Sequence, residues 1–129
     1  MGWVVGPFNS TTGGDTLNTN REELAWVAGF LDGEGSFQVN KRESGRRDWR
    51  ISIQITQVNR EVLDKAARIL GIGQINGPYA PKGISRLPQH RFYINGFERV
   101  QSVVARLWPW LGSIKRAQAK QALLTWRAA

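Results

Sequence analysis

The stretch that decides the fold is WVAGFLDGEGSF, residues 26–37. The spacing between hydrophobic residues changes along this stretch and the residues that flank it. Leu24, Val27 and Leu31 recur at helical spacing, whereas Phe37 and Val39 alternate with polar residues. Because these two periods separate amphipathic helices from half-buried strands, we expect a helix that ends at the glycines and continues directly into a strand.

The same helix has one face that is nearly bare and an end that is acidic. Ala25, Gly29 and Gly33 follow one another at four-residue steps, so they share a face. Another helix could approach that face closely. Asp32 and Glu34 fall at the helix end, where the macrodipole already places partial negative charge. Carboxylates there stabilise a helix poorly but can bind a hard cation; the alternative is two solvated acids, and an EF-hand loop is excluded because its ladder of acidic ligands is missing.

The strand pattern extends into a hairpin. After a polar turn at residues 43–48, Ile51, Ile53 and Ile55 share one side of a second strand. The predicted hairpin therefore has a hydrophobic face and a hydrogen-bonding, basic face. Further along the chain we expect a helix after Asn59 that stops at Gly71, and strands at 74–77 and 89–95 with Arg91 and Tyr93 facing outward. Helical spacing then returns at 97–107, is interrupted by Pro109, and resumes in a last helix at 113–127.

Composition sets the broad class. The chain has 129 residues, a net charge of +8, no cysteine and one histidine, which fits a single domain and excludes disulfide scaffolds, thiol nucleophiles and multi-histidine zinc sites. The charge favours a polyanionic partner, nucleic acid above all, although it could serve solubility alone. Residues 1–20 are predicted to be a flexible arm before a domain at 21–129. Without a long apolar stretch or a secretory start, we expect an intracellular protein, in a prokaryote or an organelle, with no membrane partner.

Residues 27–35 resemble the LAGLIDADG signature of homing endonucleases, in a variant that ends Asp-Gly-Glu-Gly. The resemblance extends over about residues 22–127. It includes the ITQ of residues 55–57, the LDK of 63–65 and the LWPWL of 107–111 with Lys115. It implies an α+β fold of the order αββαββα, in which a curved antiparallel β-saddle carries its helices on one face.

The resemblance also implies a catalytic site. Glu34 matches the acid that binds the catalytic metal, together with the backbone of Gly33, and the expected cofactor is Mg²⁺ or another divalent cation such as Mn²⁺. Gln57 matches a residue that orients water, and Lys115 matches a basic residue that stabilises the transition state. Arg60 is a candidate for a further basic position. Asp32 matches an acid with a mainly structural role.

A single signature implies a homodimer that cuts both strands of a long pseudo-palindromic DNA duplex and leaves 3′ overhangs. The expected dimer interface comprises Ala25, Ala28, Gly29, Asp32 and Gly33. Side chains of the strands and their loops are expected to contact bases or phosphates, and His90 to be structural. The predicted DNA-binding residues are Ser36, Gln38, Asn40, Arg42, Arg46, Arg47, Arg50, Ser52, Gln54, Asn76, Lys82, Arg86, Arg91 and Tyr93.

Two other interpretations fit the same residues. A non-cleaving relative could use the saddle to bind intron RNA as a splicing maturase, or to bind DNA as a regulator. The chain could also be one half of a two-motif enzyme. The presence of Glu34, Gln57 and Lys115 favours the nuclease.

Overall fold

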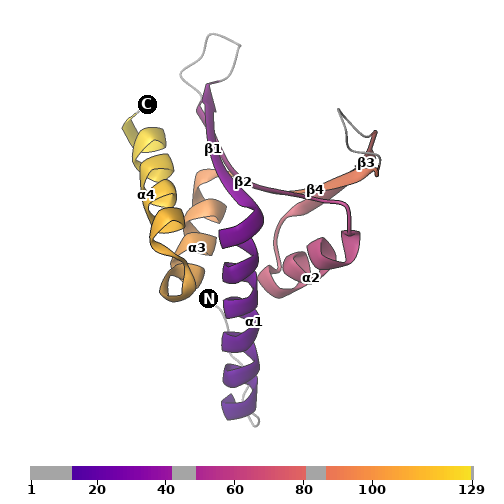
Figure 1. Ribbon diagram of the computed structural model, residues 1–129. Helices are drawn as coiled ribbons and strands as arrows, with labels where there is room; N and C mark the ends of the chain where they lie inside the picture. The colour runs from indigo at the N-terminus through magenta and orange to yellow at the C-terminus, as the bar shows by residue number, and fades with distance from the viewer. Residues whose placement is uncertain (1–12, 42–48, 81–86, 129) are drawn as a thin grey trace.

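The protein is described here by a computed structural model that covers residues 13–41, 49–80 and 87–128. Helices lie against one face of a curved four-stranded sheet and leave the other face open (Figure 1). The order matches the predicted αββαββα arrangement, followed by a short 3-10 helix and the last helix that the sequence also predicts. The elements are α1 (Gly13–Glu34), β1 (Gly35–Lys41), β2 (Trp49–Gln57), α2 (Arg60–Leu70), β3 (Gln74–Tyr79), β4 (Gln89–Asn95), α3 (Phe97–Leu107), the 3-10 helix η1 (Trp108–Trp110) and α4 (Ser113–Ala128).

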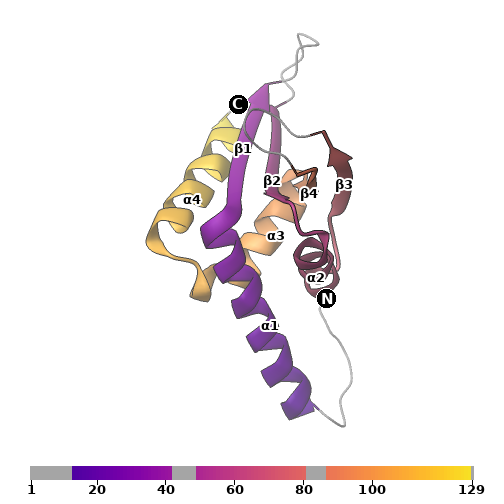
Figure 2. The same cartoon turned by 45° about the vertical axis from the view of Figure 1, so that its right-hand side comes forward.

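The first helix begins earlier than the sequence predicts. It starts at Gly13, so Asn20 lies within the helix and not at its cap. Helix α1 therefore extends into the segment predicted as an arm, residues 1–20, of which residues 1–12 lie outside the described part. The N-terminal half of α1 projects away from the other elements (Figure 2). A projecting segment faces no core and needs no hydrophobic period, and extending an existing helix requires no new nucleation.

The sheet is antiparallel, in the order β1-β2-β4-β3. Phe37 pairs with Ile53, which pairs with Ile94, and this row faces the helices. Because side chains alternate along a strand, the neighbouring rows point to the opposite side. We call that side the outer face; it is lined by Ser36, Gln38, Asn40, Arg50, Ser52, Gln54, Thr56, Gln74, Asn76, Arg91, Tyr93 and Asn95.

Capping residues set the bounds of the second helix as predicted. The Asn59 side chain accepts a hydrogen bond from the backbone N–H of Glu61 at 2.9 Å. At the other end Gly71 adopts a left-handed conformation with φ 74° and donates to the carbonyl of Ala67. A side chain is disfavoured at that φ, so both ends of α2 are encoded locally.

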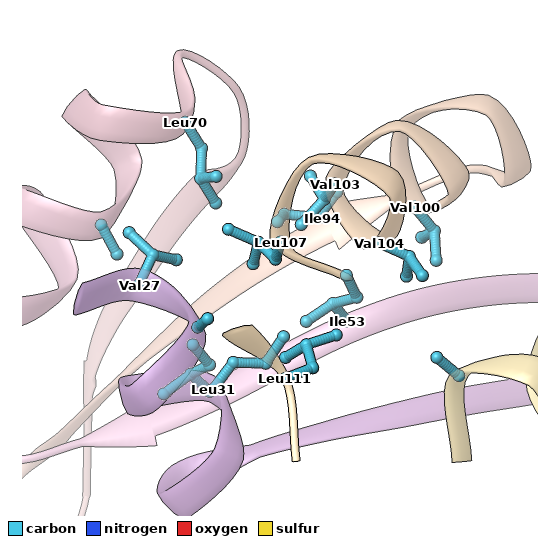
Figure 3. Close-up of a cluster of buried hydrophobic side chains, with 14 of the residues drawn as sticks. Val27, Leu31, Ile53, Leu70, Ile94, Val100, Val103, Val104, Leu107 and Leu111 are labelled. Carbon is cyan, nitrogen blue, oxygen red and sulfur yellow. The ribbon is translucent and has the colours of Figure 1, made fainter. Parts of the chain in front are cut away.

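The core lies between the helices and the inner face of the sheet. Leu31, Ile53 and Leu111 gather where α1 approaches β2 and the short connection between η1 and α4 (Figure 3). Fully burying such a side chain contributes roughly 1.5–3 kcal/mol, so the end of α1 is held firmly against the sheet. None of the helices in residues 13–41, 49–80 and 87–128 is long and apolar enough to cross a membrane.

Candidate functional site

The C-terminal end of α1 is joined to the start of α4 through Asp32. Both carboxylate oxygens of Asp32 accept a hydrogen bond from the backbone N–H of Gly112, each at 3.0 Å. Gly112 directly precedes α4. Asp32 therefore has a structural role, because it fixes the first turn of α4 beside the end of α1.

That junction determines where Glu34 and Lys115 lie. Glu34 is the last residue of α1 and is exposed, and Lys115 is the third residue of α4 and is partly buried. Each is only two or three residues from the Asp32–Gly112 hydrogen bonds. The fold thus brings the two helix ends that carry these residues together, although they are far apart in sequence.

Gln57 reaches the same end of the sheet through strand pairing. Gly35, which follows Glu34, pairs with Ile55, and Gln57 is the second residue after Ile55. Gly35 itself has no space for a side chain, because a Cβ there would lie 2.9 Å from the carbonyl oxygen of Leu31. The tight passage from α1 into β1 therefore requires glycine and fixes Glu34 at the edge of the sheet near Gln57.

His90 lies directly opposite Gln57 in the β2–β4 pairing. Its Nδ1 atom is buried and has no hydrogen-bond partner among the residues that the structure describes. Arg60, at the start of α2, faces Asp64 with Nε 3.6 Å from Oδ1, and both side chains are about half exposed. Its guanidinium is therefore already paired within α2.

The donor atoms near Glu34 suit a hard divalent cation. A carboxylate and the backbone carbonyl of Gly33 are both oxygen ligands, which Mg²⁺ and Mn²⁺ prefer. Within the described residues, no group of three or more His, Cys, Asp or Glu side chains gathers as a metal site. Within that described part, the carboxylate of Glu34 and the carbonyl of Gly33 would fill only part of the coordination shell of such a cation.

The bare face of α1 is open. A Cβ built on Gly29 or on Gly33 would meet no atom within 4 Å, and Ala25 is partly exposed. Ala28 does not belong to this face: it is 0 % exposed and packs in the chain's own core. Ala28 shares the inward side of α1 with Leu24, so its side chain is already covered within the chain, and the open face is formed by Ala25, Gly29 and Gly33.

The outer face of the sheet is polar throughout its described part. The predicted positions Ser36, Gln38, Asn40, Arg50, Gln54, Asn76, Arg91 and Tyr93 all lie on it. It also carries Thr56, Gln74 and Asn95, which the sequence reasoning missed although strand alternation would have found them. Eight of these side chains, from all four strands, line a hollow of about 250 Å³: Asn40, Arg50, Ser52, Gln54, Gln74, Asn76, Tyr93 and Asn95.

Several side chains of the outer face form hydrogen bonds with one another. The Gln54 amide donates to the Ser52 hydroxyl at 3.2 Å, and the Gln38 amide donates to the Ser36 hydroxyl at 3.5 Å. Ser52 is only 7 % exposed. Ser52 therefore supports the more exposed Gln54, and a direct DNA contact by Ser52 stays a prediction.

Arg91, Tyr93 and Tyr79 form a second cluster on the outer face. The Arg91 guanidinium donates from Nη1 to the Tyr93 hydroxyl at 3.3 Å, and the two tyrosine hydroxyls are 3.4 Å apart. The hydrogen bond from Tyr79, assisted by Arg91, lowers the pKa of Tyr93. The same bond raises the pKa of Tyr79 above its ordinary value. The remaining predicted DNA contacts lie outside the described residues: Arg42, Arg46, Arg47, Lys82 and Arg86.

Comparisons with known proteins agree with this arrangement. Residues 27–81 match the family model described as LAGLIDADG endonuclease. A comparison with curated protein sequences finds no match.

Solved structures share the fold over most of the chain. The homing endonuclease I-CvuI, in complex with its target in the presence of Ca, is 28% identical, with a TM-score of 0.67 over 85% of this chain and 69% of that one. The same enzyme, in complex with the I-CreI target in the presence of Mg and with the DNA not cleaved, gives 28% identity and a TM-score of 0.66 over 84% and 68%. The group I intron-encoded homing endonuclease I-CeuI, complexed with DNA, shares the fold at 18% identity, with a TM-score of 0.60 over 83% and 53%.

Proposed function

We propose that this chain, which has the LAGLIDADG homing endonuclease fold, is a metal-dependent endonuclease that cuts a specific DNA duplex as a homodimer. The observation that carries the proposal is the position of Glu34. Glu34 is the last residue of α1, at the edge of a polar sheet face, and it falls within the residues that match the family model. Gln57 lies at the same end of the sheet and Lys115 on the adjoining helix start.

The outer face of the sheet is suited to DNA in shape and chemistry. It is curved, it is lined by amide, hydroxyl and guanidinium groups, and the chain carries a net charge of +8. The major groove of DNA, about 12 Å wide, admits a β-ribbon, and its base edges present the donors and acceptors that Arg, Asn and Gln can recognise. The similar enzyme I-CvuI was solved in complex with DNA targets, which supports the same partner for this chain.

The open face of α1 supports a two-fold dimer. Two copies that pair through Ala25, Gly29 and Gly33 would bring both Glu34 carboxylates together at the dimer axis. This pairing would supply oxygen ligands in addition to those of the described residues of one chain. It would also place one set of catalytic residues beside each DNA strand, so the target would be long and roughly palindromic, and the staggered cuts would leave 3′ overhangs.

Each catalytic residue has a defined task in phosphodiester hydrolysis. Glu34 and the Gly33 carbonyl would hold Mg²⁺ or Mn²⁺, which supplies Lewis-acid stabilisation at the phosphate and activates water when bound. The Gln57 side-chain amide orients the attacking water by hydrogen bonding. The Lys115 ammonium stabilises the negative charge that develops on the phosphoryl oxygens.

A selection experiment tests the proposal. The full chain is incubated with a library of random duplexes, bound duplexes are recovered without Mg²⁺, and Mg²⁺ is then added. We expect one pseudo-palindromic family of sequences that is cut at a fixed position. Persistent binding without cleavage would contradict the nuclease function, and preferential recovery of structured RNA from a parallel RNA library would favour a maturase.

A further inference from the structure

Both tyrosines of the chain lie close to one arginine, Arg91. Tyr79 is on β3 and Tyr93 on β4, and they are the only tyrosines in the sequence. The Arg91 guanidinium carbon lies 5.2 Å from the centre of the Tyr79 ring and 5.8 Å from that of Tyr93. Nη1 of Arg91 also donates to the Tyr93 hydroxyl. Two cation–π contacts and one hydrogen bond therefore restrain the guanidinium.

Most N–H donors of the Arg91 guanidinium are available to a ligand. A guanidinium carries five N–H groups, and only the bond to Tyr93 uses one of them in the described structure. No described carboxylate forms an ion pair with Arg91. A restrained, unneutralised guanidinium loses little rotamer freedom when it binds a partner.

The position of Arg91 favours a base over a phosphate. β4 is an inner strand, and Arg91 pairs with Thr56 on one side and with Asn76 on the other. Its side chain therefore rises from the middle of the outer face and not from a rim. On a sheet that lies in the major groove, the middle of the face meets base edges, whereas the rims meet the backbone.

We propose that Arg91 reads a guanine in each half of the target, through O6 and N7, and that Tyr79 is the positioning residue that holds the guanidinium for this contact. The inference rests on the proposed DNA-binding function. Guanine is then the base that this part of the outer face selects, and Tyr79 acts only through Arg91. Arginine is matched to guanine because its forked donors meet both acceptors at once.

Base substitution tests the first half of the proposal. Affinities of the full chain are measured without Mg²⁺ for the selected duplex and for duplexes in which each G·C base pair is replaced in turn. For Arg91→Lys we expect discrimination at one guanine per half-site to fall roughly 10- to 100-fold, with the other positions unchanged. The control is Lys120→Ala, which removes one positive charge from an exposed site on α4 and should leave every preference intact.

Two other outcomes would contradict the proposal at different levels. If Arg91→Lys weakens binding to all duplexes equally, Arg91 contacts a phosphate and the inference is wrong. If the unmodified protein shows no sequence preference at all, the proposed function itself fails, and this failure does not depend on Arg91.

Tyrosine ionisation tests the second half without DNA. Since the chain has only two tyrosines, the absorbance of tyrosinate reports Tyr79 and Tyr93 alone. We expect two separate steps in the unmodified protein, and in Tyr79→Phe a single step displaced upward from the first, because Tyr93 loses its hydrogen bond from Tyr79. Tyr79→Phe should also lower guanine discrimination several-fold, and Tyr79→Leu, which removes the ring, should lower it further. An unchanged titration together with unchanged discrimination would overturn the role of Tyr79.

Discussion

Asp32 accepts the backbone N–H of Gly112 with both carboxylate oxygens at 3.0 Å, across 80 residues of sequence. This contact holds the end of α1 against the start of α4, and those two helix ends carry Glu34 and Lys115. An acid within the signature thus fixes the relative position of two residues that are proposed to act on the same phosphate.

Removing that contact should loosen the junction. Asp32→Ala leaves the Gly112 N–H without its acceptor, and we expect the free energy of unfolding to fall by about 1 kcal/mol, since the bond is solvent-exposed. Asp32→Asn keeps one acceptor oxygen and should lose less. Urea denaturation measures both changes. If Asp32→Ala unfolds at the same urea concentration as the unmodified protein, the bond has no structural role.

Gln57 and Lys115 should affect cleavage far more than binding. Gln57→Ala and Lys115→Met each remove a group that is proposed to act at the reacting phosphate, so we expect the cleavage rate to fall roughly 10²- to 10³-fold. Single-turnover cleavage of the selected duplex measures the rate. Lys120→Met, five residues further along α4 and exposed, is the matched control and should cut normally. An equal loss in both lysine variants would show that Lys115 contributes only charge.

The open face of α1 should tolerate a larger side chain in the monomer but not in the dimer. A Cβ at Gly29 meets no atom within 4 Å, so Gly29→Leu should fold normally, while its side chain blocks close helix pairing. Light scattering of Gly29→Leu, measured for the protein alone and for its complex with DNA, should show a monomer. Ala117→Leu, at an exposed site on α4, should remain dimeric. A dimer that persists in Gly29→Leu would place the interface elsewhere.

DNA affinity should fall steeply with salt. A protein that neutralises roughly six or more phosphates loses about 10³-fold or more in affinity between 50 and 200 mM salt, because bound counterions are released. A titration of binding against salt concentration gives the slope. Lys120→Ala should leave the slope unchanged, since this exposed residue lies on α4, which packs on the side of the sheet opposite the outer face. A flat salt dependence would argue against a DNA-binding surface.

Local patterns predicted most of the secondary structure. Alternation at Ile51, Ile53 and Ile55 fixes which side of β2 faces the core, and Asn59 and Gly71 fix the bounds of α2. These signals depend on residues that are close in sequence, so a single chain contains them.

The contacts that assemble the site could not be predicted in this way. Asp32–Gly112 and Tyr79–Tyr93 join different elements, and no local period encodes either pair. The inward position of Ala28 could not be read from the sequence for a similar reason: a small residue on α1 can face either a partner or the core, and only the packing of the chain shows that Ala28 is covered. The roles of Glu34, Gln57 and Lys115 came from the family resemblance and stay predictions.

The most direct test of the central claim is strand cleavage by Glu34→Gln, compared with the unmodified chain on the selected duplex with Mg²⁺. Glutamine keeps the size of the side chain but removes the charge that would hold the cation. We predict that the unmodified protein makes a double-strand break with 3′ overhangs, whereas Glu34→Gln binds the duplex with similar affinity and leaves both strands intact. Cleavage by Glu34→Gln at the normal rate would contradict the account.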